Sequence, residues 1–297
     1  MQSLPITKTA DAANDPSTDA DIAGRNGWLA HLELGFVAVD QRSVLARRRH
    51  KGPLVVQKSL YPEGSGICHA IIVHPPGGIA GGDRLQLDVN VGMNAHALLT
   101  TPGAGKWYKA NHEQASQQLG FKVAQDAVLE WFPQETILFD AARAKLETRI
   151  ELTTNAVYAG WEITCFGRQA AGERFQQGTL LQRTQLYRDG KRIWAEFADL
   201  QAGNALMDSA VGLNGATVNA GMLIAAGIVP AEVLEACRAI KPEDSAAIGV
   251  TALPEIFAAR YLGMSPEHAR HYFESIWSIV RPWYAGVQSK RPRIWNT

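Results

Sequence analysis

Carboxylates inside apolar, strand-like segments are the side chains of this sequence best suited to chemistry. Glu162 interrupts the apolar run 157–166, and Glu196 interrupts the run 193–197. A carboxylate within a β core is costly unless it is paired or bound to a cation. For any one such residue, a solvated position or an ion pair with a basic residue such as Arg168 is the more frequent arrangement. These carboxylates therefore predict solvated positions, ion pairs or cation ligands.

A loop of unusual composition adds a third carboxylate. Proline fixes φ and lacks a backbone donor, whereas glycine permits positive φ and close backbone approach. The proline- and glycine-rich segment 74–83 can therefore be neither a helix nor a regular strand, and we expect a shaped loop of the kind that often carries function. Its residues are His74, Pro75, Pro76, Gly77, Gly78, Ile79, Ala80, Gly81, Gly82 and Asp83.

Two further carboxylates, Glu135 and Asp140, flank the apolar run 137–139. They could serve a hydrolase on an all-β scaffold as general acid and base. The sequence shows no matching nucleophile and no oxyanion donor, so this hypothesis stands below the others. Turnover of ester or glycoside substrates by the purified protein would support it.

Other groups of reactive residues have simpler interpretations. On a strand, His69 and His74 point to opposite faces, and Cys68 lies roughly 20 Å from His74 at about 3.3 Å per residue. We therefore expect core or strand-end residues there rather than a metal site or a nucleophilic dyad. The segment 103–106 resembles a phosphate loop, but Thr100 replaces the first glycine of a Walker A motif and Trp107 its final hydroxyl residue. A tight turn between strands is the preferred interpretation.

Composition is that of an ordinary globular protein. The chain has 297 residues, of which 46% are hydrophobic and 20% charged, and 29 basic residues balance 29 acidic ones. A net charge of zero gives no field that would attract nucleic acid or anionic lipid. Three widely spaced cysteines fit a reducing cytosol, and no apolar run is long enough for a membrane span. We expect a cytoplasmic protein that binds neither nucleic acid nor membrane.

The order of periodic segments predicts an all-β body followed by two helices. Residues 1–26 are polar and predict a disordered lead, and residues 27–297 predict a single β-rich domain. Many short strands at even spacing favour a closed or stacked all-β architecture. We expect helices at about 230–240 and 266–284. The predicted strands are 84–91, 127–132, 144–152, 157–166 and 179–187, the last turning at Asp189-Gly190 into a hairpin, and a strand pair at 246–251 and 256–262.

Six blocks along the chain resemble the UreD (UreH) family of urease accessory proteins. The blocks come in family order and cover nearly the whole chain from Gly27. They are the glycine loop 74–83, residues 100–106, residues 133–136 with Asp140, residues 165–168, Gly172-Glu173 and the terminal 291–295. The resemblance implies a β-helix-like stack and a non-enzymatic maturation factor that helps to place nickel in urease. It also implies three partners, namely the urease apoprotein, the helical accessory protein UreF and the GTPase UreG, and a homodimer of the assembled complex is a further expectation.

The resemblance also gives the carboxylates a role as a lining for a nickel passage. Oxygen ligands suit such a passage, because a conduit must bind an ion strongly enough to admit it and weakly enough to release it. We therefore expect transient Ni²⁺ and no tightly bound cofactor. A plain interaction module without an ion passage remains an alternative. The expected passage residues are Asp83, Glu162 and Glu196, with Glu135 and Asp140 as further candidates, and Arg168 joins the loop prolines and glycines as a motif residue.

Overall fold

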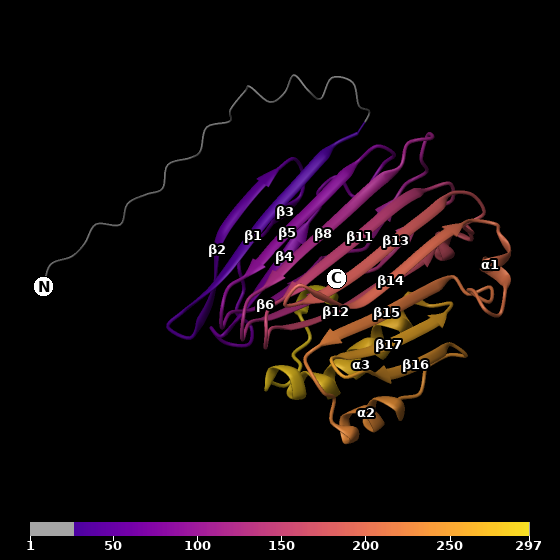
Figure 1. Cartoon of the computed structure of the whole chain (residues 1–297). Coiled ribbons are helices and arrows are strands. Elements are labelled where there is room, and N and C mark those ends of the chain that lie inside the picture. The colour runs from indigo at the N-terminus through magenta and orange to yellow at the C-terminus, as the bar shows by residue number, and fades with distance from the viewer. Residues whose placement is uncertain (1–26, 297) are drawn as a thin grey trace, which may run out of the picture.

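The computed structural model describes residues 27–296, and two β-sheets form most of it (Figure 1). The disordered lead predicted for residues 1–26 lies outside the described residues. One sheet has seven strands in the order β14-β13-β11-β8-β5-β1-β2. Its strands are β1 (Leu29–Val39), β2 (Arg42–Lys51), β5 (Arg84–Val91), β8 (Ala115–Val123), β11 (Arg143–Leu152), β13 (Thr179–Arg188) and β14 (Lys191–Gln201).

The second sheet has ten strands, and its main path runs in the order β16-β17-β15-β12-β9-β6-β4-β3. Two short strands, β7 and β10, pair with each other, and β10 joins them to β12. The strands are β3 (Val55–Val56), β4 (Ile67–Val73), β6 (His96–Thr100), β7 (Gly105–Trp107), β9 (Val128–Phe132), β10 (Thr136–Leu138), β12 (Val157–Phe166), β15 (Val218–Ala225), β16 (Ala247–Ala252) and β17 (Ile256–Gly263).

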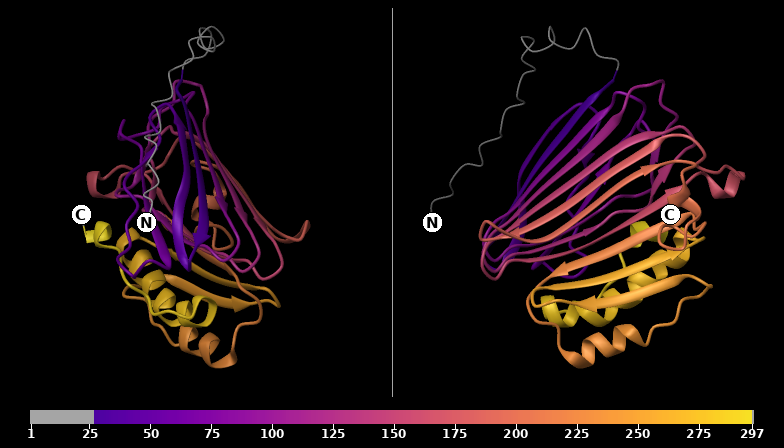
Figure 2. Two further views of the ribbon diagram at one scale, coloured as in Figure 1. Left: turned by 90° about the vertical axis from the view of Figure 1, so that its left-hand side faces the viewer. Right: turned by 45° about the vertical axis from the view of Figure 1, so that its right-hand side comes forward.

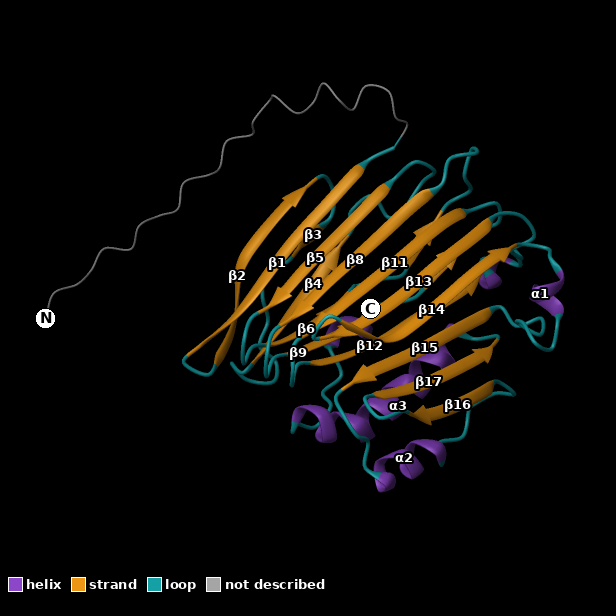
Figure 3. Ribbon diagram, viewed as in Figure 1, coloured by secondary structure: helices purple, strands orange, loops and turns teal. Residues whose placement is uncertain are grey.

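From β4 to β13, and apart from the short strands β7 and β10, successive strands alternate between the sheets, which makes the centre of the protein a β-helix-like stack. Strands β4, β6, β9 and β12 are parallel in one sheet, while β5, β8, β11 and β13 are parallel in the other. Between β4 and β13, each coil of the chain therefore contributes one of these parallel strands to each sheet, and two of the coils add the short strands β7 and β10. Figure 3 shows the long strands lying side by side. The all-β prediction and its β-helix-like form are confirmed.

Two hydrophobic cores follow from the alternation of side chains along the strands. Inward-facing residues such as Leu87, Leu119 and Ile150 fill the space between the sheets. The other face of the ten-stranded sheet packs on the helices, where Trp161 and Phe273 lie. Strand β12 is covered on both faces, which explains its almost continuous apolar sequence.

Helices α2 (Ala231–Arg238) and α3 (Pro266–Ala285) lie on the outer face of the ten-stranded sheet, as both views in Figure 2 show. Ser265 caps α3 by accepting a hydrogen bond from the His268 amide, and Gly286 ends it at a φ of 67°. The predictions of two C-terminal helices are confirmed. A four-residue helix, α1, was not predicted because it has too few residues to show a helical period. The helices are α1 (Ala205–Asp208), α2 (Ala231–Arg238) and α3 (Pro266–Ala285), with 3-10 turns at Gln169–Ala171 and Arg293–Asn296.

The stack ends in two antiparallel units that belong to different sheets. The hairpin β13–β14 turns at Asp189-Gly190, both of positive φ, as its sequence predicted. Strand β15 then enters the other sheet and pairs with β17, which pairs with β16. Within residues 27–296, no helix has the length and apolar character that a membrane crossing needs.

Candidate functional site

Glu162 lies in the space between the two sheets. It belongs to the inward-facing set of β12, together with Tyr158. From the seven-stranded sheet, Thr148 donates a hydrogen bond of 3.1 Å to its Oε1 and Gln182 one of 2.5 Å to its Oε2. Burial raises the pKa of Glu162, while these bonds and the charge of Arg260 act in the opposite direction. Glu162 is thus a deep carboxylate that polar side chains from the facing sheet hold in place.

One side of Glu162 borders a cavity of about 360 Å³, here called the inner cavity. The glycine loop contributes His74, Gly77 and Gly78 to its wall, and residues 101–106 form another part. Most of the remaining wall is apolar and includes Trp131. Two blocks singled out from the sequence therefore meet at one cavity, whose wall also includes the acidic residues Glu147 and Glu162.

The other side of Glu162 borders a second cavity of about 150 Å³, here called the outer cavity. Glu162 and Thr164 are wall residues of both cavities, so they mark the place where the two meet. Apart from these two, the polar residues that line the outer cavity are Gln182, Thr184, Glu196, Asn219 and Arg260.

Strand register explains why polarity increases toward this end of the protein. Leu87, Leu119, Thr148, Thr184 and Glu196 form one continuous row across β5, β8, β11, β13 and β14. They share a face, because paired residues in neighbouring strands point the same way. The row changes from leucine to threonine to glutamate as it approaches the edge strand. The space between the sheets is therefore apolar in the middle of the stack and lined by oxygen atoms at the outer cavity.

Glu196 makes an ion pair with Arg260 across the gap between the sheets. The Arg260 Nη2 atom contacts Glu196 Oε1, and the two side chains are 41% and 40% exposed. Glu196 and Glu162 thus line one cavity. The pairing partner, Arg260, was missed, although a basic residue inside the apolar segment 256–262 was a visible signal.

Asp83 is placed elsewhere, at the end of the glycine loop. Its carboxylate accepts hydrogen bonds of 2.8 Å from the Trp28 and Ala80 amides, so it fixes the loop and its contact with the start of β1. Burial lowers the pKa of His74, and the charge of Asp83 opposes that shift. Asp83 is not a wall residue of either cavity. Its charge nevertheless acts on His74, which is a wall residue of the inner cavity.

The glycine loop has the shaped form that its sequence predicted. Gly77 and Gly82 have φ values of 79° and 88°, in the left-handed region that favours glycine. A Cβ at Gly78 would lie 2.2 Å from the Tyr108 ring, so the ring packs where a side chain would stand. The Ile79 amide donates to the Lys106 carbonyl at 2.7 Å and ties the loop to β7. Pro75 and Pro76 are exposed.

Glu135 and Asp140 have separate structural contacts. Glu135 is buried and pairs with Arg270 of α3 at 2.6 Å. Asp140 accepts hydrogen bonds of 2.8 Å from the Gln176 and Gln177 amides. Both carboxylates are held by these partners, so the arrangement gives the hydrolase hypothesis no acid and base that face a common substrate.

Arg168 anchors the turn that follows β12. Its guanidinium binds the Glu173 carboxylate at 2.6 Å and lies 4.5 Å from the centre of the Phe139 ring. The block Gly172-Glu173 therefore supplies the ion-pair partner of Arg168 in the block 165–168. Arg168 is exposed and acts on the shape of this turn, away from the two cavities.

A buried charged group that was not predicted from the sequence lies beneath α3 and is here called the Glu130 cluster. Arg281 donates to Glu130 at 2.9 and 2.8 Å, and it also binds Glu63. His96 lies 2.9 Å from Glu130. Burial acts to raise the pKa of Glu130, yet the hydrogen bonds and charges of His96 and Arg281 lower it well below its ordinary range. Glu130 interrupts the apolar strand β9, the same signal that identified Glu162.

The site offers a cation scattered oxygen atoms rather than a compact cage. Within the described part of the chain, no three histidine, cysteine, aspartate or glutamate side chains come together as a metal-binding group. The outer cavity provides the carboxylates of Glu162 and Glu196 with hydroxyl and amide oxygens around them. Such ligands favour brief, water-assisted contacts with a hard divalent ion.

Comparison with known proteins identifies the family. The sequence model of the family described as UreD urease accessory protein matches residues 29–296. The chain belongs to the UreD family. It is 54% identical over 270 residues to the urease accessory protein UreD of Methylobacillus flagellatus, covering 91% of this chain and 95% of that one. The UreD protein of Janthinobacterium sp. is 46% identical over 298 residues, covering 98% of this chain and 99% of the relative.

Proposed function

We propose that this UreD-family protein is a non-enzymatic urease maturation factor that carries Ni²⁺ through the joined cavities toward the urease apoprotein. One observation carries the proposal: Glu162 belongs to the walls of both cavities. An ion that passes from the glycine-loop end to the Glu196 end meets this carboxylate on its way. Membership of a family of urease accessory proteins supports urease as the destination. Nickel as the cargo follows from the family resemblance noted in the sequence.

Coordination chemistry supports transport over storage. Histidine and thiolate clusters bind Ni²⁺ tightly, whereas carboxylate, hydroxyl and amide oxygens bind it weakly and leave room for water. Thr148 and Gln182 hold the Glu162 carboxylate in the space between the sheets, so it needs no large rearrangement to meet the ion. A raised pKa adds a reason for release, because protonation competes with the metal for the same oxygens.

The partners are part of the same proposal. A protein without an active site of its own must work within an assembly, and the family resemblance points to the urease apoprotein, the helical accessory protein UreF and the GTPase UreG. In that assembly this chain bridges urease and the nucleotide-driven partner, and the complex forms a homodimer. It works in the cytoplasm, where nickel is inserted into the apoprotein.

The test replaces the two passage carboxylates by their amide isosteres. Glu162→Gln with Glu196→Gln is produced together with urease and the accessory proteins, and nickel per purified urease active site is measured. We expect normal co-purification of the accessory complex and a several-fold fall in urease nickel. A matched control is Glu33→Gln with Glu151→Gln, two carboxylates on the outer face of the seven-stranded sheet that belong to the wall of neither cavity.

Two outcomes separate the passage from the alternatives. Normal nickel in urease matured with the passage variant, beside normal assembly, would leave the chain as an interaction module without an ion route. Loss of assembly in the passage variant but not in the control would assign Glu162 and Glu196 to the partner interface instead.

A further inference from the structure

Arg260 reaches the outer cavity through a gap that a side chain would close. Its strand partners are Gly221 of β15 and Gly249 of β16, and Gly221 is in turn the partner of Glu162 on β12. A Cβ on Gly221 would lie 2.2 Å from the Arg260 Nη1 atom. The guanidinium therefore lies directly over a glycine, between its own strand and Glu162.

The far end of Arg260 meets the opposite sheet. Nη2 contacts the Glu196 carboxylate, and the guanidinium carbon lies 5.9 Å from the centre of the Trp194 ring. Trp194 and Glu196 are neighbours on the inner face of β14. The Glu162 charge also acts on Arg260, since it offsets part of the lowering that burial imposes on the pKa of the guanidinium. One fixed positive charge thus serves both carboxylates of the outer cavity.

We propose that the Arg260 guanidinium is a tethered cation that occupies the carboxylate site of the outer cavity until a divalent ion displaces it. This inference rests on the proposed passage. It adds that the Arg260 guanidinium occupies the carboxylates of the outer cavity while no divalent ion is bound there. The pair with Glu196 is well suited to displacement, because partly exposed ion pairs contribute little net free energy. A divalent ion brings twice the charge to the same oxygens, and the long arginine side chain can swing away when its carboxylate is taken.

A tethered cation competes with a metal, so its removal should tighten metal binding. We expect Arg260→Met to bind Ni²⁺ about fivefold more tightly than the wild-type chain, the competition that a partly exposed ion pair can supply. The measurement is titration of the purified full-length protein with Ni²⁺ alone against a competing chelator dye. Glu162→Gln with Glu196→Gln in the Arg260→Met background should abolish the gain.

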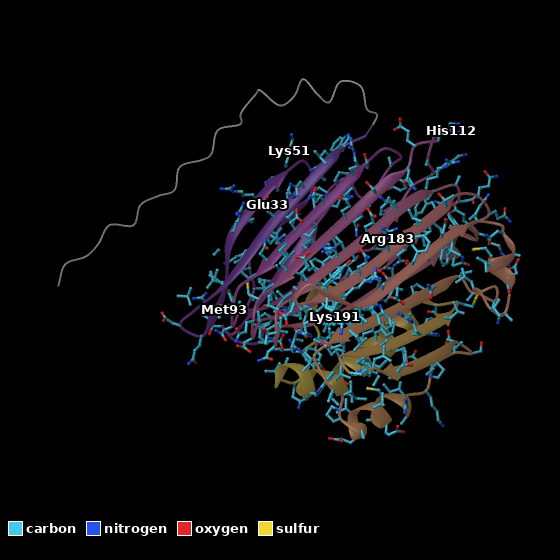
Figure 4. All side chains as sticks on the ribbon, viewed as in Figure 1. Glu33, Lys51, Met93, His112, Arg183 and Lys191 are labelled. Atoms are coloured by element: carbon cyan, nitrogen blue, oxygen red, sulfur yellow. The ribbon has the colours of Figure 1, made fainter. Side chains whose placement is uncertain are left out.

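Three further variants separate competition from a structural role. Arg260→Lys keeps the charge and should bind Ni²⁺ nearly as weakly as the wild type. Gly221→Ala keeps the arginine but moves its head group, so it should tighten binding by an intermediate factor. Arg183→Met is the matched control, because Arg183 lies on β13 on the outer face of the seven-stranded sheet (Figure 4) and should leave Ni²⁺ affinity unchanged.

The results can overturn this inference without deciding the proposed function. Equal Ni²⁺ affinity in Arg260→Met and wild type, or no binding by either, would refute the tethered cation. A lower melting temperature with unchanged affinity would make Arg260 a clamp between the sheets. Tighter binding in Arg260→Met beside normal nickel in urease matured with the Glu162 and Glu196 variant would keep the tethered cation and reject the passage.

Discussion

Arg281→Met should destabilise the protein more than any surface substitution, because it removes the countercharge of two buried carboxylates. The Arg281 side chain is fully buried and lies 2.5 Å from Glu63 and 2.8 Å from Glu130. It also donates to the Gln288 carbonyl at 2.9 Å, which fixes the segment after α3. Breaking a buried ion pair from one side costs about 3–5 kcal/mol, because the remaining charge stays buried without a partner.

The assay is urea unfolding followed by circular dichroism, with thermal unfolding as a second measure. A loss of about 3–5 kcal/mol should lower the melting temperature by about 6–10 °C in a chain of this length. The matched control is Arg238→Met, which breaks an exposed pair with Glu235 and should change the free energy of unfolding by less than about 1 kcal/mol. Equal effects of the two substitutions would refute the reasoning. Adding Glu130→Gln to Arg281→Met should recover part of the lost free energy of unfolding, because it removes one of the two buried carboxylates that Arg281→Met leaves without their arginine partner.

Three other changes test separate parts of the structure. The raised pKa of Glu162 means that its carboxyl group keeps a proton to higher pH in the folded protein than in the unfolded chain. The free energy of unfolding of the wild type, relative to that of Glu162→Gln, should therefore fall as pH rises from the ordinary pKa of 4.5 through the raised pKa. Urea unfolding at a series of pH values measures this, and an equal pH dependence in the two proteins would contradict it. Trp295→Ala should cost about 3–5 kcal/mol in urea unfolding, because the ring is buried against Phe132 and Trp161, and a change below about 1 kcal/mol would show that the C-terminal segment does not hold the core. Gly178→Ala should cost at least about 1–3 kcal/mol, because φ is 106° there and a Cβ would lie 2.2 Å from the Ala142 carbonyl oxygen; a melting temperature equal to that of wild type would reject the strain.

Strand positions were predictable from sequence because the alternation of apolar and polar residues shows which residues of a strand share a buried face. The segment 84–91 is β5 and the segment 157–166 is β12, with the predicted bounds. The turn at Asp189-Gly190 was equally predictable, since few residues accept positive φ. The alternation of apolar and polar residues could not predict which strands are neighbours in a sheet. Strands β8 and β11 pair in parallel although β9 and β10 separate them in the chain, and no local signal carries that register.

The candidate site divides in the same way. A glutamate in an apolar strand marked Glu162, and the same rule would have marked Glu130 had it been applied to β9. The two glutamates differ only in which face of the sheet they occupy. Glu162 faces the space between the sheets, whereas Glu130 faces α3 and meets Arg281, 151 residues later. Sequence alone could not tell these outcomes apart.

The family, the all-β body, the two C-terminal helices and a short set of carboxylates worth testing could be predicted from the linear sequence. Those features depend on local alternation, turn chemistry and residue type, which a linear pattern contains. Three relations required the folded structure: Glu162 and Glu196 share a cavity, Asp83 holds a loop, and Arg260 pairs with Glu196. Those relations arise from pairing between distant strands, where a shift of one residue would have turned each side chain to the other face.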